Sequence, residues 1–206
     1  MIAVVDYGVG NLFSVEKAFT ALGADVQVTD CAEKILAADK LILPGVGAFG
    51  DCMNNLTASG LIPAIRKYAD MGKPLLGICV GLQILFEDSE ESPTVKGLGL
   101  LQGSVRKIQA AGLKVPHMGW NSLEVVKSCR QTGLYRGLSE KPYVYFVHSY
   151  HAVPTDSSLI TAQTEYGEKV TASVASRNIQ AVQFHPEKSG DVGLQILKNF
   201  VEREEQ

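Results

Sequence analysis

The sequence of 206 residues has little of several features that mark whole classes of protein. None of its 4 cysteines forms a Cys-x-x-Cys pair, and no apolar run reaches the roughly 18 residues of a membrane-spanning helix. Its 19 basic and 22 acidic residues give a net charge of −3, so it lacks the basic excess of proteins that bind a nucleic-acid backbone. These absences exclude a disulfide scaffold, a helical membrane span and a cationic nucleic-acid-binding protein.

Cysteine usage and the start of the chain indicate the compartment. A chain of this length buries roughly 70% of the surface that its unfolded form exposes, so it folds without disulfide bonds. An acid at position 6 interrupts the apolar start that a secretory signal needs, and the scattered histidines lack the spacing of a zinc site. We therefore expect a cytoplasmic protein without a metal site. Its cysteines are expected to be reduced thiols: Cys31, Cys52, Cys79 and Cys129.

Hydrophobic patterning predicts an α/β fold in which a mostly parallel sheet is flanked by helices. In the first half, short β-branched runs alternate with segments whose apolar residues recur at helical spacing, which is typical of βαβ units. In the second half, strand-like runs follow one another closely, so we expect antiparallel additions to the sheet. No linker or repeat divides the chain, and residues 1–206 are predicted to form one domain. The expected strands cover residues 2–5, 25–29, 40–43, 75–79, 97–108, 122–126, 143–153, 159–164, 170–175 and 179–184, and the expected helices cover residues 12–22, 61–71 and 192–201, with another that begins over 82–86.

The most informative local motif is Gly77-Ile78-Cys79-Val80-Gly81, which follows a buried strand and precedes a helical segment. This is the context of a nucleophile elbow, in which a strained turn presents a nucleophile and flanking glycines let the backbone pack closely. The amides and dipole at the start of the following helix favour a thiolate there. A buried structural cysteine explains the pentapeptide equally well, so the motif alone leaves both interpretations open.

A second motif supplies what a cysteine nucleophile needs, a base and a group that orients the base. The expected strand 179–184 leads to His185-Pro186-Glu187. Pro186 stops the strand pairing and forms a turn, so the Glu187 carboxylate can hold one ring nitrogen of His185 while the other faces the thiol. Alone, such a tripeptide is more often a solvated surface turn. The carboxyl ends of neighbouring parallel strands share one crevice, however, and two such motifs in one chain favour a catalytic site.

A third strand end carries Pro44-Gly45-Val46-Gly47. A glycine-rich turn in this position can present backbone N–H groups to an oxyanion, together with the amide of Val80 directly after the cysteine. Taken alone, the same four residues are a plain tight turn, so their interpretation depends on the other two motifs.

Together these motifs resemble the class I glutamine amidotransferases, which use a Cys-His-Glu triad. Within that family, the chain resembles the glutaminase subunits of imidazole glycerol phosphate synthases over essentially its whole length. The segment 116–121 discriminates most, because other amidotransferases share the triad but lack that segment. The resemblance is carried by residues 6–11 (Asp-Tyr-Gly-Val-Gly-Asn), 44–47, 116–121 (Pro-His-Met-Gly-Trp-Asn) and 184–189 (Phe-His-Pro-Glu-Lys-Ser).

The resemblance implies hydrolysis of glutamine to glutamate and ammonia without a cofactor. It makes Cys79 the nucleophile, His185 its base and Glu187 the acid that orients the base. Val80 stands where the family usually has leucine, a difference of little consequence because the backbone amide is the group used. The implied oxyanion donors are Val80, Gly45, Val46 and Gly47, and the implied glutamine-binding residues are Gln83, Glu91, Ser149 and Tyr150, with Glu91 holding the ammonium group.

The resemblance also implies a partner. Glutaminases of this kind pass ammonia through an interior channel to a cyclase subunit, a (β/α)8 barrel that forms imidazole glycerol phosphate in histidine biosynthesis. The sequence has no phosphate-binding loop for such an acceptor, because Phe13 replaces the third glycine of a dinucleotide fingerprint. We expect a heterodimer with no nucleic-acid or membrane partner. Its expected interface contains Asn11, Pro116, Met118, Trp120, Asn121 and Lys188.

Three other functions remain open at this point. A glutaminase subunit of another synthase, such as that of pyridoxal phosphate synthesis, has the same triad but lacks the segment 116–121. A non-catalytic regulatory subunit keeps the fold, although an intact Cys79, His185 and Glu187 argues against it. A peptidase with an elbow cysteine is a weaker alternative, because it has no need of glutamine-binding groups.

Overall fold

A computed structural model describes residues 1–131 and 133–202. Its largest element is an eight-stranded sheet. In spatial order the strands are β2 (Val26–Thr29), β1 (Ile2–Val5), β3 (Lys40–Gly45), β4 (Leu75–Cys79), β13 (Ile179–Val182), β12 (Lys169–Ser176), β11 (Ile160–Glu165) and β8 (Glu124–Val125). The first five are parallel neighbours, and the last three continue the sheet in antiparallel pairing. The fold class predicted from the sequence is therefore confirmed.

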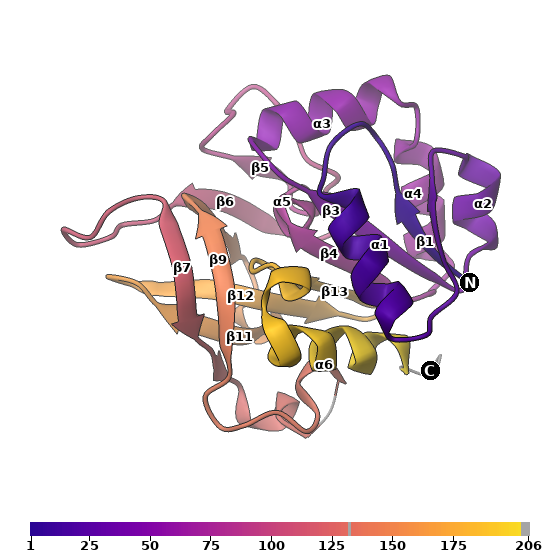
Figure 1. The fold of residues 1–206 in the computed structure, drawn as a ribbon. Helices are drawn as coiled ribbons and strands as arrows, with labels where there is room; N and C mark the ends of the chain where they lie inside the picture. Colours follow the sequence, from indigo (N-terminus) through magenta and orange to yellow (C-terminus); the bar gives the residue numbers. More distant parts are fainter. Residues whose placement is uncertain (132, 203–206) are drawn as a thin grey trace.

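Helices cover both faces of the parallel part of this sheet. They are α1 (Leu12–Ala21), α2 (Ala32–Ala37), α3 (Phe49–Ala58), α4 (Ile62–Asp70), α5 (Val80–Gln83) and α6 (Gly190–Val201), and the 3-10 turns are η1 (Lys127–Cys129), η2 (Gly133–Tyr135), η3 (Ser157–Leu159) and η4 (Pro186–Lys188). α1 and α6 contact each other and lie in front of the sheet in Figure 1, whereas α4, which contacts α2, lies behind it. No helix in the described part of the chain is long and apolar enough to span a membrane.

The central strands are buried because helices cover them on both sides. Every residue of β4 and β13 is buried, and their sequences read as nearly continuous apolar runs, as expected for parallel strands inside a sandwich of helices. The helices bury one stripe each, for example Val15 and Phe19 of α1 and Ile65 and Tyr68 of α4. This packing fixes the carboxyl ends of β3, β4 and β13 next to one another.

Part of the second half departs from the prediction that its strands extend the large sheet. The expected strand 143–153 is interrupted at Ser149, and its two halves belong to different small sheets. The expected strand 97–108 forms only from Gly103, because the backbone of residues 97–101 bonds to residues 84–87 instead. The small sheets contain β7 (His117–Ser122) with β9 (Tyr143–His148), and β10 (Tyr150–Pro154) with β6 (Gly103–Lys107) and β5 (Asp88–Ser89).

Candidate active site

Cys79 ends β4 in a conformation with φ 56° and ψ −114°, which is strained for a residue that has a side chain. Glycines on both sides make room for it. A Cβ on Gly81 would lie 1.9 Å from the Leu43 carbonyl oxygen, and one on Gly77 would lie 2.9 Å from the Gly81 carbonyl oxygen. The backbone therefore forms the sharp turn that the sequence predicted, with Cys79 at the carboxyl end of a central strand.

The helix after this turn is shorter than the sequence predicted. α5 begins at Val80 and has only 4 residues, so Phe86 lies beyond its end. A single turn of aligned peptide dipoles produces only a weak field at the cysteine. The electrostatic environment of Cys79 therefore depends mainly on the side chains around it.

His185 and Glu187 approach Cys79 from the neighbouring strand. β13 lies beside β4 in parallel register, and shortly beyond its end His185 lies close enough to Cys79 for the two side chains to interact, at the same cavity. The Nδ1 atom of His185 lies 2.8 Å from Oε1 of Glu187 in the turn η4. Only 3% of the histidine side chain and none of the glutamate side chain is exposed. The structure thus brings together three side chains that two separate motifs predicted.

These contacts determine the charge of His185. Burial on its own lowers the pKa of an imidazole, but the hydrogen bonds and charges of Cys79 and Glu187 outweigh burial and raise the pKa of His185 to about 10. Because Nδ1 is bonded to the carboxylate, Nε2 is the ring nitrogen that faces the sulfur. At neutral pH the histidine is therefore protonated, with Nδ1 held by Glu187 and Nε2 directed toward Cys79.

Gln183 is a residue of the site that the sequence motifs did not reveal. Its buried side chain donates from Nε2 to Cys79 Sγ over 3.8 Å and accepts a 3.0 Å hydrogen bond at Oε1 from Gln83 Nε2. Gln83 also donates to the Tyr150 carbonyl over 3.0 Å. The only signal in the sequence is a lone amide side chain within the apolar run 181–184.

The turn over residues 44–47 lies directly beside Cys79. β3 and β4 pair so that Gly45 stands opposite Cys79, and a Cβ on Gly45 would lie 2.7 Å from the backbone nitrogen of Gly81. Gly47 has φ 84°, in the left-handed region that favours glycine. Glycine is therefore needed at both positions, once for close approach and once for the backbone angle.

A cavity of about 400 Å³ opens at Cys79 and His185, a volume that suits a small ligand. Glu91 borders it, and its Oε2 accepts a 2.7 Å hydrogen bond from the Phe49 N–H at the start of α3, which fixes the carboxylate. Of the predicted oxyanion and glutamine-binding residues, Gly45 alone does not line the cavity. The others line it together with two residues of the expected interface: Val46, Gly47, Val80, Gln83, Glu91, Ser149, Tyr150, Pro116 and Lys188.

A hydrogen-bonded chain of side chains links β7 to this cavity. Asn121 Nδ2 lies 3.2 Å from His117 Nε2, His117 Nδ1 lies 3.1 Å from His148 Nε2, and His148 Nδ1 lies 2.8 Å from the Tyr150 carbonyl. Burial lowers the pKa of His117 to about 4 and that of His148 to about 3, so both rings are neutral at pH 7. One choice of tautomers, with a proton on each Nδ1, satisfies every contact in the chain.

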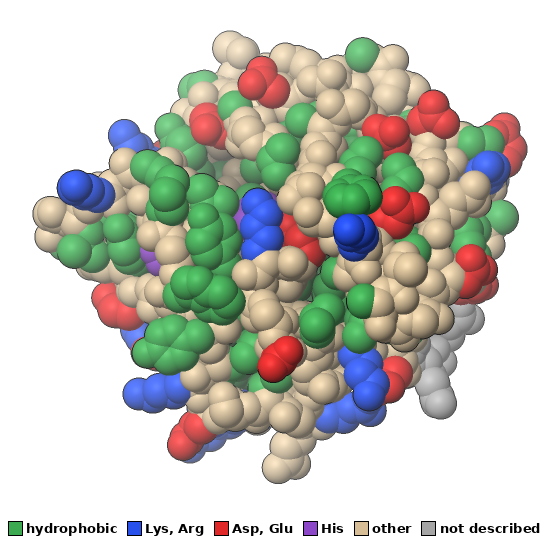
Figure 2. Space-filling model, viewed as in Figure 1, with side chains coloured by type: hydrophobic (Ala, Val, Ile, Leu, Met, Phe, Trp, Pro, Cys, Tyr) green, Lys and Arg blue, Asp and Glu red, His purple; other side chains and the backbone are tan. Residues whose placement is uncertain are grey.

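The expected interface residues of β7 divide between its two faces. Met118 and Trp120 are 61% and 55% exposed, whereas the Asn121 side chain is bonded to His117 and to the Glu165 carbonyl. Side chains alternate along a strand, so Met118 and Trp120 share the outer face. Figure 2 shows hydrophobic side chains gathered on the side of the molecule where Figure 1 places β7 and β9.

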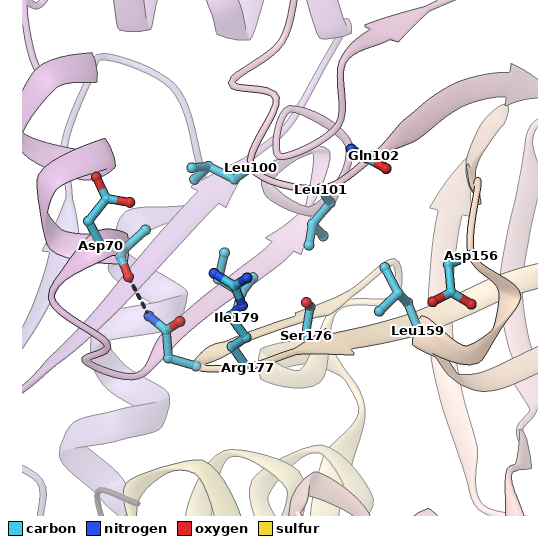
Figure 3. A pocket seen from close by; sticks show the side chains of 11 residues that line it. Asp70, Leu100, Leu101, Gln102, Asp156, Leu159, Ser176, Arg177 and Ile179 are labelled. Carbon is cyan, nitrogen blue, oxygen red and sulfur yellow. Dashed lines mark hydrogen bonds between the residues drawn. The ribbon is translucent and has the colours of Figure 1, made fainter.

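A second cavity, of about 330 Å³, lies at the opposite edge of the sheet, where β4 and β13 begin (Figure 3). Three exposed charged residues border it: Asp70, Asp156 and Arg177. The dashed line in Figure 3 is the 3.0 Å hydrogen bond from Asn178 Nδ2 to the Ala69 carbonyl, which joins α4 to the turn before β13. None of the residues that the motifs single out is among its described lining residues.

Known proteins with similar structures have the same fold. A solved glutamine amidotransferase superposes with a TM-score of 0.75 at 20% identity, covering 98% of this chain and 100% of that one. PurLQS from Thermotoga maritima gives a TM-score of 0.74 at 21% identity, covering 97% of this chain and 96% of that one. At these identities the likeness shows the architecture alone.

Sequence comparisons identify the family. The curated relatives include the imidazole glycerol phosphate synthase subunit HisH of Moorella thermoacetica, which is 53% identical over 98% of this chain and 94% of its own length. The subunit HisH of Methanothermobacter thermautotrophicus is 51% identical over 98% of both chains. The family described as glutamine amidotransferase class-I matches residues 3–203. The chain therefore belongs to the class-I glutamine amidotransferase family.

Proposed function

We propose that residues 1–206 act as one amidotransferase domain that hydrolyses glutamine and passes the ammonia to the cyclase subunit of an imidazole glycerol phosphate synthase in histidine biosynthesis. The observation that carries this proposal is the buried series of contacts from Cys79 through His185 to Glu187 at the edge of a cavity. The names of the relatives that are 53% and 51% identical favour this synthase over that of pyridoxal phosphate synthesis.

Glutamine binding uses the residues that border the cavity. We place the ammonium group of the substrate at Glu91, because the Phe49 N–H holds one carboxylate oxygen and orients the other for a ligand. Ser149 and Tyr150 contribute the facing surface, and Gln83 keeps the Tyr150 carbonyl in place. This arrangement directs the side-chain amide of glutamine toward Cys79.

The first half of the reaction forms a thioester. The Cys79 thiolate attacks the amide carbon, and the carbonyl oxygen becomes an oxyanion that the amide of Val80 and the turn 44–47 stabilise. The C–N bond then breaks while the His185 imidazolium gives its Nε2 proton to the leaving nitrogen. Ammonia leaves, and the glutamyl group remains bound to sulfur.

The second half of the reaction releases glutamate. His185, now neutral, takes a proton from a water molecule, which attacks the thioester carbon. The oxyanion forms at the same position, and its collapse expels the Cys79 thiolate. Glu187 stays bonded to Nδ1 throughout and stabilises the imidazolium, which is lost in the first half of the cycle and formed again in the second.

The partner is expected to dock on the outer face of β7. Met118 and Trp120 project from this strand, and Trp120 packs edge-on against Tyr145 with ring centroids 6.3 Å apart. Lys188 lies at the cavity, directly after the triad glutamate, so a partner there is close to the site of ammonia release. A tryptophan held by a neighbouring ring on an exposed strand has the character of an interface anchor.

Docking is expected to activate the glutaminase, because a glycine-rich oxyanion turn can adopt alternative peptide orientations and a partner can select the productive one. Glutamate release by the chain alone should be compared with release in the presence of the cyclase subunit and its nucleotide substrate. We expect the complex to be much faster. Equal rates in the two conditions would contradict activation by the partner.

Trp120→Ala tests the docking surface in the same assay. We expect it to raise the concentration of cyclase needed for half-maximal activation by about 30-fold, as for an interface anchor worth about 2 kcal/mol. Met71→Ala is the matched control. Met71 is a similarly exposed hydrophobic residue (47%), but it lies directly after α4 and not on β7. Equal activation curves for the two variants would place the interface elsewhere.

A further inference from the structure

Two buried side chains hold carbonyl groups of the turn 44–47. The Tyr7 hydroxyl donates a 2.6 Å hydrogen bond to the Pro44 carbonyl, and the Cys52 thiol donates a 3.3 Å hydrogen bond to the Val46 carbonyl. Only 4% of Tyr7 and none of Cys52 is exposed. Tyr7 follows β1 and Cys52 lies in the first turn of α3, so two separate elements hold the turn from its buried side.

The planarity of the peptide bond makes these contacts relevant to the site. In a trans peptide the C=O and N–H groups point in opposite directions. The bond to the Pro44 carbonyl therefore fixes the direction of the Gly45 N–H, and the bond to the Val46 carbonyl fixes that of the Gly47 N–H. Both carbonyls point at buried side chains. The Gly47 N–H is therefore directed away from Cys52, at a residue that borders the cavity, whereas Gly45 belongs to β3, opposite Cys79, and does not border it.

Both side chains carry the proton that they donate. Burial raises the pKa of Tyr7 far above neutrality and raises the pKa of the Cys52 thiol to about 11. The two groups are close enough to each other, and to Cys79, to interact electrostatically. Rotation of the peptide after Val46 would break the thiol contact and leave buried polar groups without their partners.

We propose that Tyr7 and Cys52 are positioning residues that keep the turn 44–47, in the complex with the partner, in the orientation in which it stabilises the oxyanion, without touching the substrate themselves. This inference rests on the proposed glutaminase function. If it is right, the two side chains affect the rate of the chemical step. If their role is purely structural, they affect only the packing of the core.

The test compares Cys52→Ala, Cys52→Ser and Tyr7→Phe in the full chain with the cyclase subunit and its substrate present. We expect Cys52→Ala and Tyr7→Phe to lower kcat for glutamine about fivefold each, as for one lost hydrogen bond, with KM within about twofold of the wild type. Cys52→Ser keeps a donor and is expected to recover most of kcat. Cys129→Ala is the control, because this half-buried thiol lies in η1 and does not border the cavity at Cys79.

A second measurement separates positioning from general damage to the site. The rate at which iodoacetamide alkylates Cys79, followed by peptide mapping, measures how accessible and reactive the thiolate is. This reaction forms no oxyanion, so it does not depend on the oxyanion turn. We expect the alkylation rate of Cys52→Ala to stay within about twofold of the wild type while turnover of glutamine falls. An unchanged kcat, or alkylation that falls in parallel with turnover, would overturn the proposal. Absence of glutamine turnover in the wild type would instead overturn the proposed function on which it rests.

Discussion

Cys79→Ala is expected to lower glutamine hydrolysis by about 10⁴-fold or more, the loss typical of removing a catalytic nucleophile. Alanine fills most of the space of the thiol but leaves nothing to form the thioester. Synthesis from free ammonium salts by the complex with the cyclase is expected to remain at the wild-type rate, since that chemistry takes place on the partner. The two rates are measured as glutamate release and as product formation with ammonium in place of glutamine.

Cys31→Ala is the matched control for this experiment. Cys31 is also a free cysteine, but it stands at the start of α2, is not among the residues that line the cavity at Cys79, and its thiol donates to Glu33. Its removal is expected to change neither rate. Glutamine hydrolysis by Cys79→Ala at a rate near that of the wild type would show that the nucleophile is assigned wrongly.

Glu187→Gln is expected to lower kcat/KM by about 10²- to 10⁴-fold and to move the alkaline limb of the pH profile to lower pH by about one to three units. The Glu187 carboxylate and Cys79 raise the pKa of His185 to about 10, so the wild type keeps its imidazolium, and its activity, until the pH rises through that value. Without the carboxylate the pKa of His185 falls, and the proton that ammonia needs is lost at a lower pH. The measurement is kcat/KM against pH for the activated complex.

The pair of His151 and Glu168 provides the control for this pH profile. His151 Nε2 lies 3.7 Å from Glu168 Oε1, and the histidine is 6% exposed, so it is a second buried histidine beside a carboxylate. Glu168→Gln is expected to leave the alkaline limb in place. An alkaline limb that stays at the wild-type pH in Glu187→Gln would show that this carboxylate does not set the charge of His185.

Local patterns were sufficient to predict those parts of the site that lie at strand ends. The expected strand 75–79 is β4 itself, and the motifs after β3, β4 and β13 meet because parallel strands end at one edge of the sheet. Each of these motifs also contains the glycine or proline that its turn requires, so the turn could be recognised from the local sequence. The grouping of Cys79, His185 and Glu187 could therefore be proposed before its geometry was known, with the resemblance to the family deciding in favour of a catalytic role.

Residues whose roles depend on tertiary register were not predictable in this way. Gln183 acts on Cys79 only because β13 lies beside β4, and Cys52 reaches Val46 only because α3 turns back under the preceding loop. β7 was not predicted, because Gly119 and other residues of low strand propensity obscure the alternation of polar and apolar side chains. Its strand conformation is stabilised by pairing with β9. α5 ends early for a similar reason, since residues 97–101 bond to the backbone that would have continued it.

Trapping of the glutamyl thioester is the most direct test of the central claim, which is that Cys79 attacks glutamine. The complex with the cyclase and its substrate is mixed with glutamine, quenched in acid during turnover and mapped by peptide mass spectrometry. We expect a glutamyl group on the peptide that contains Cys79, and none on that peptide from Cys79→Ala. Rapid glutamate release in which a different cysteine carries the glutamyl group would contradict this claim.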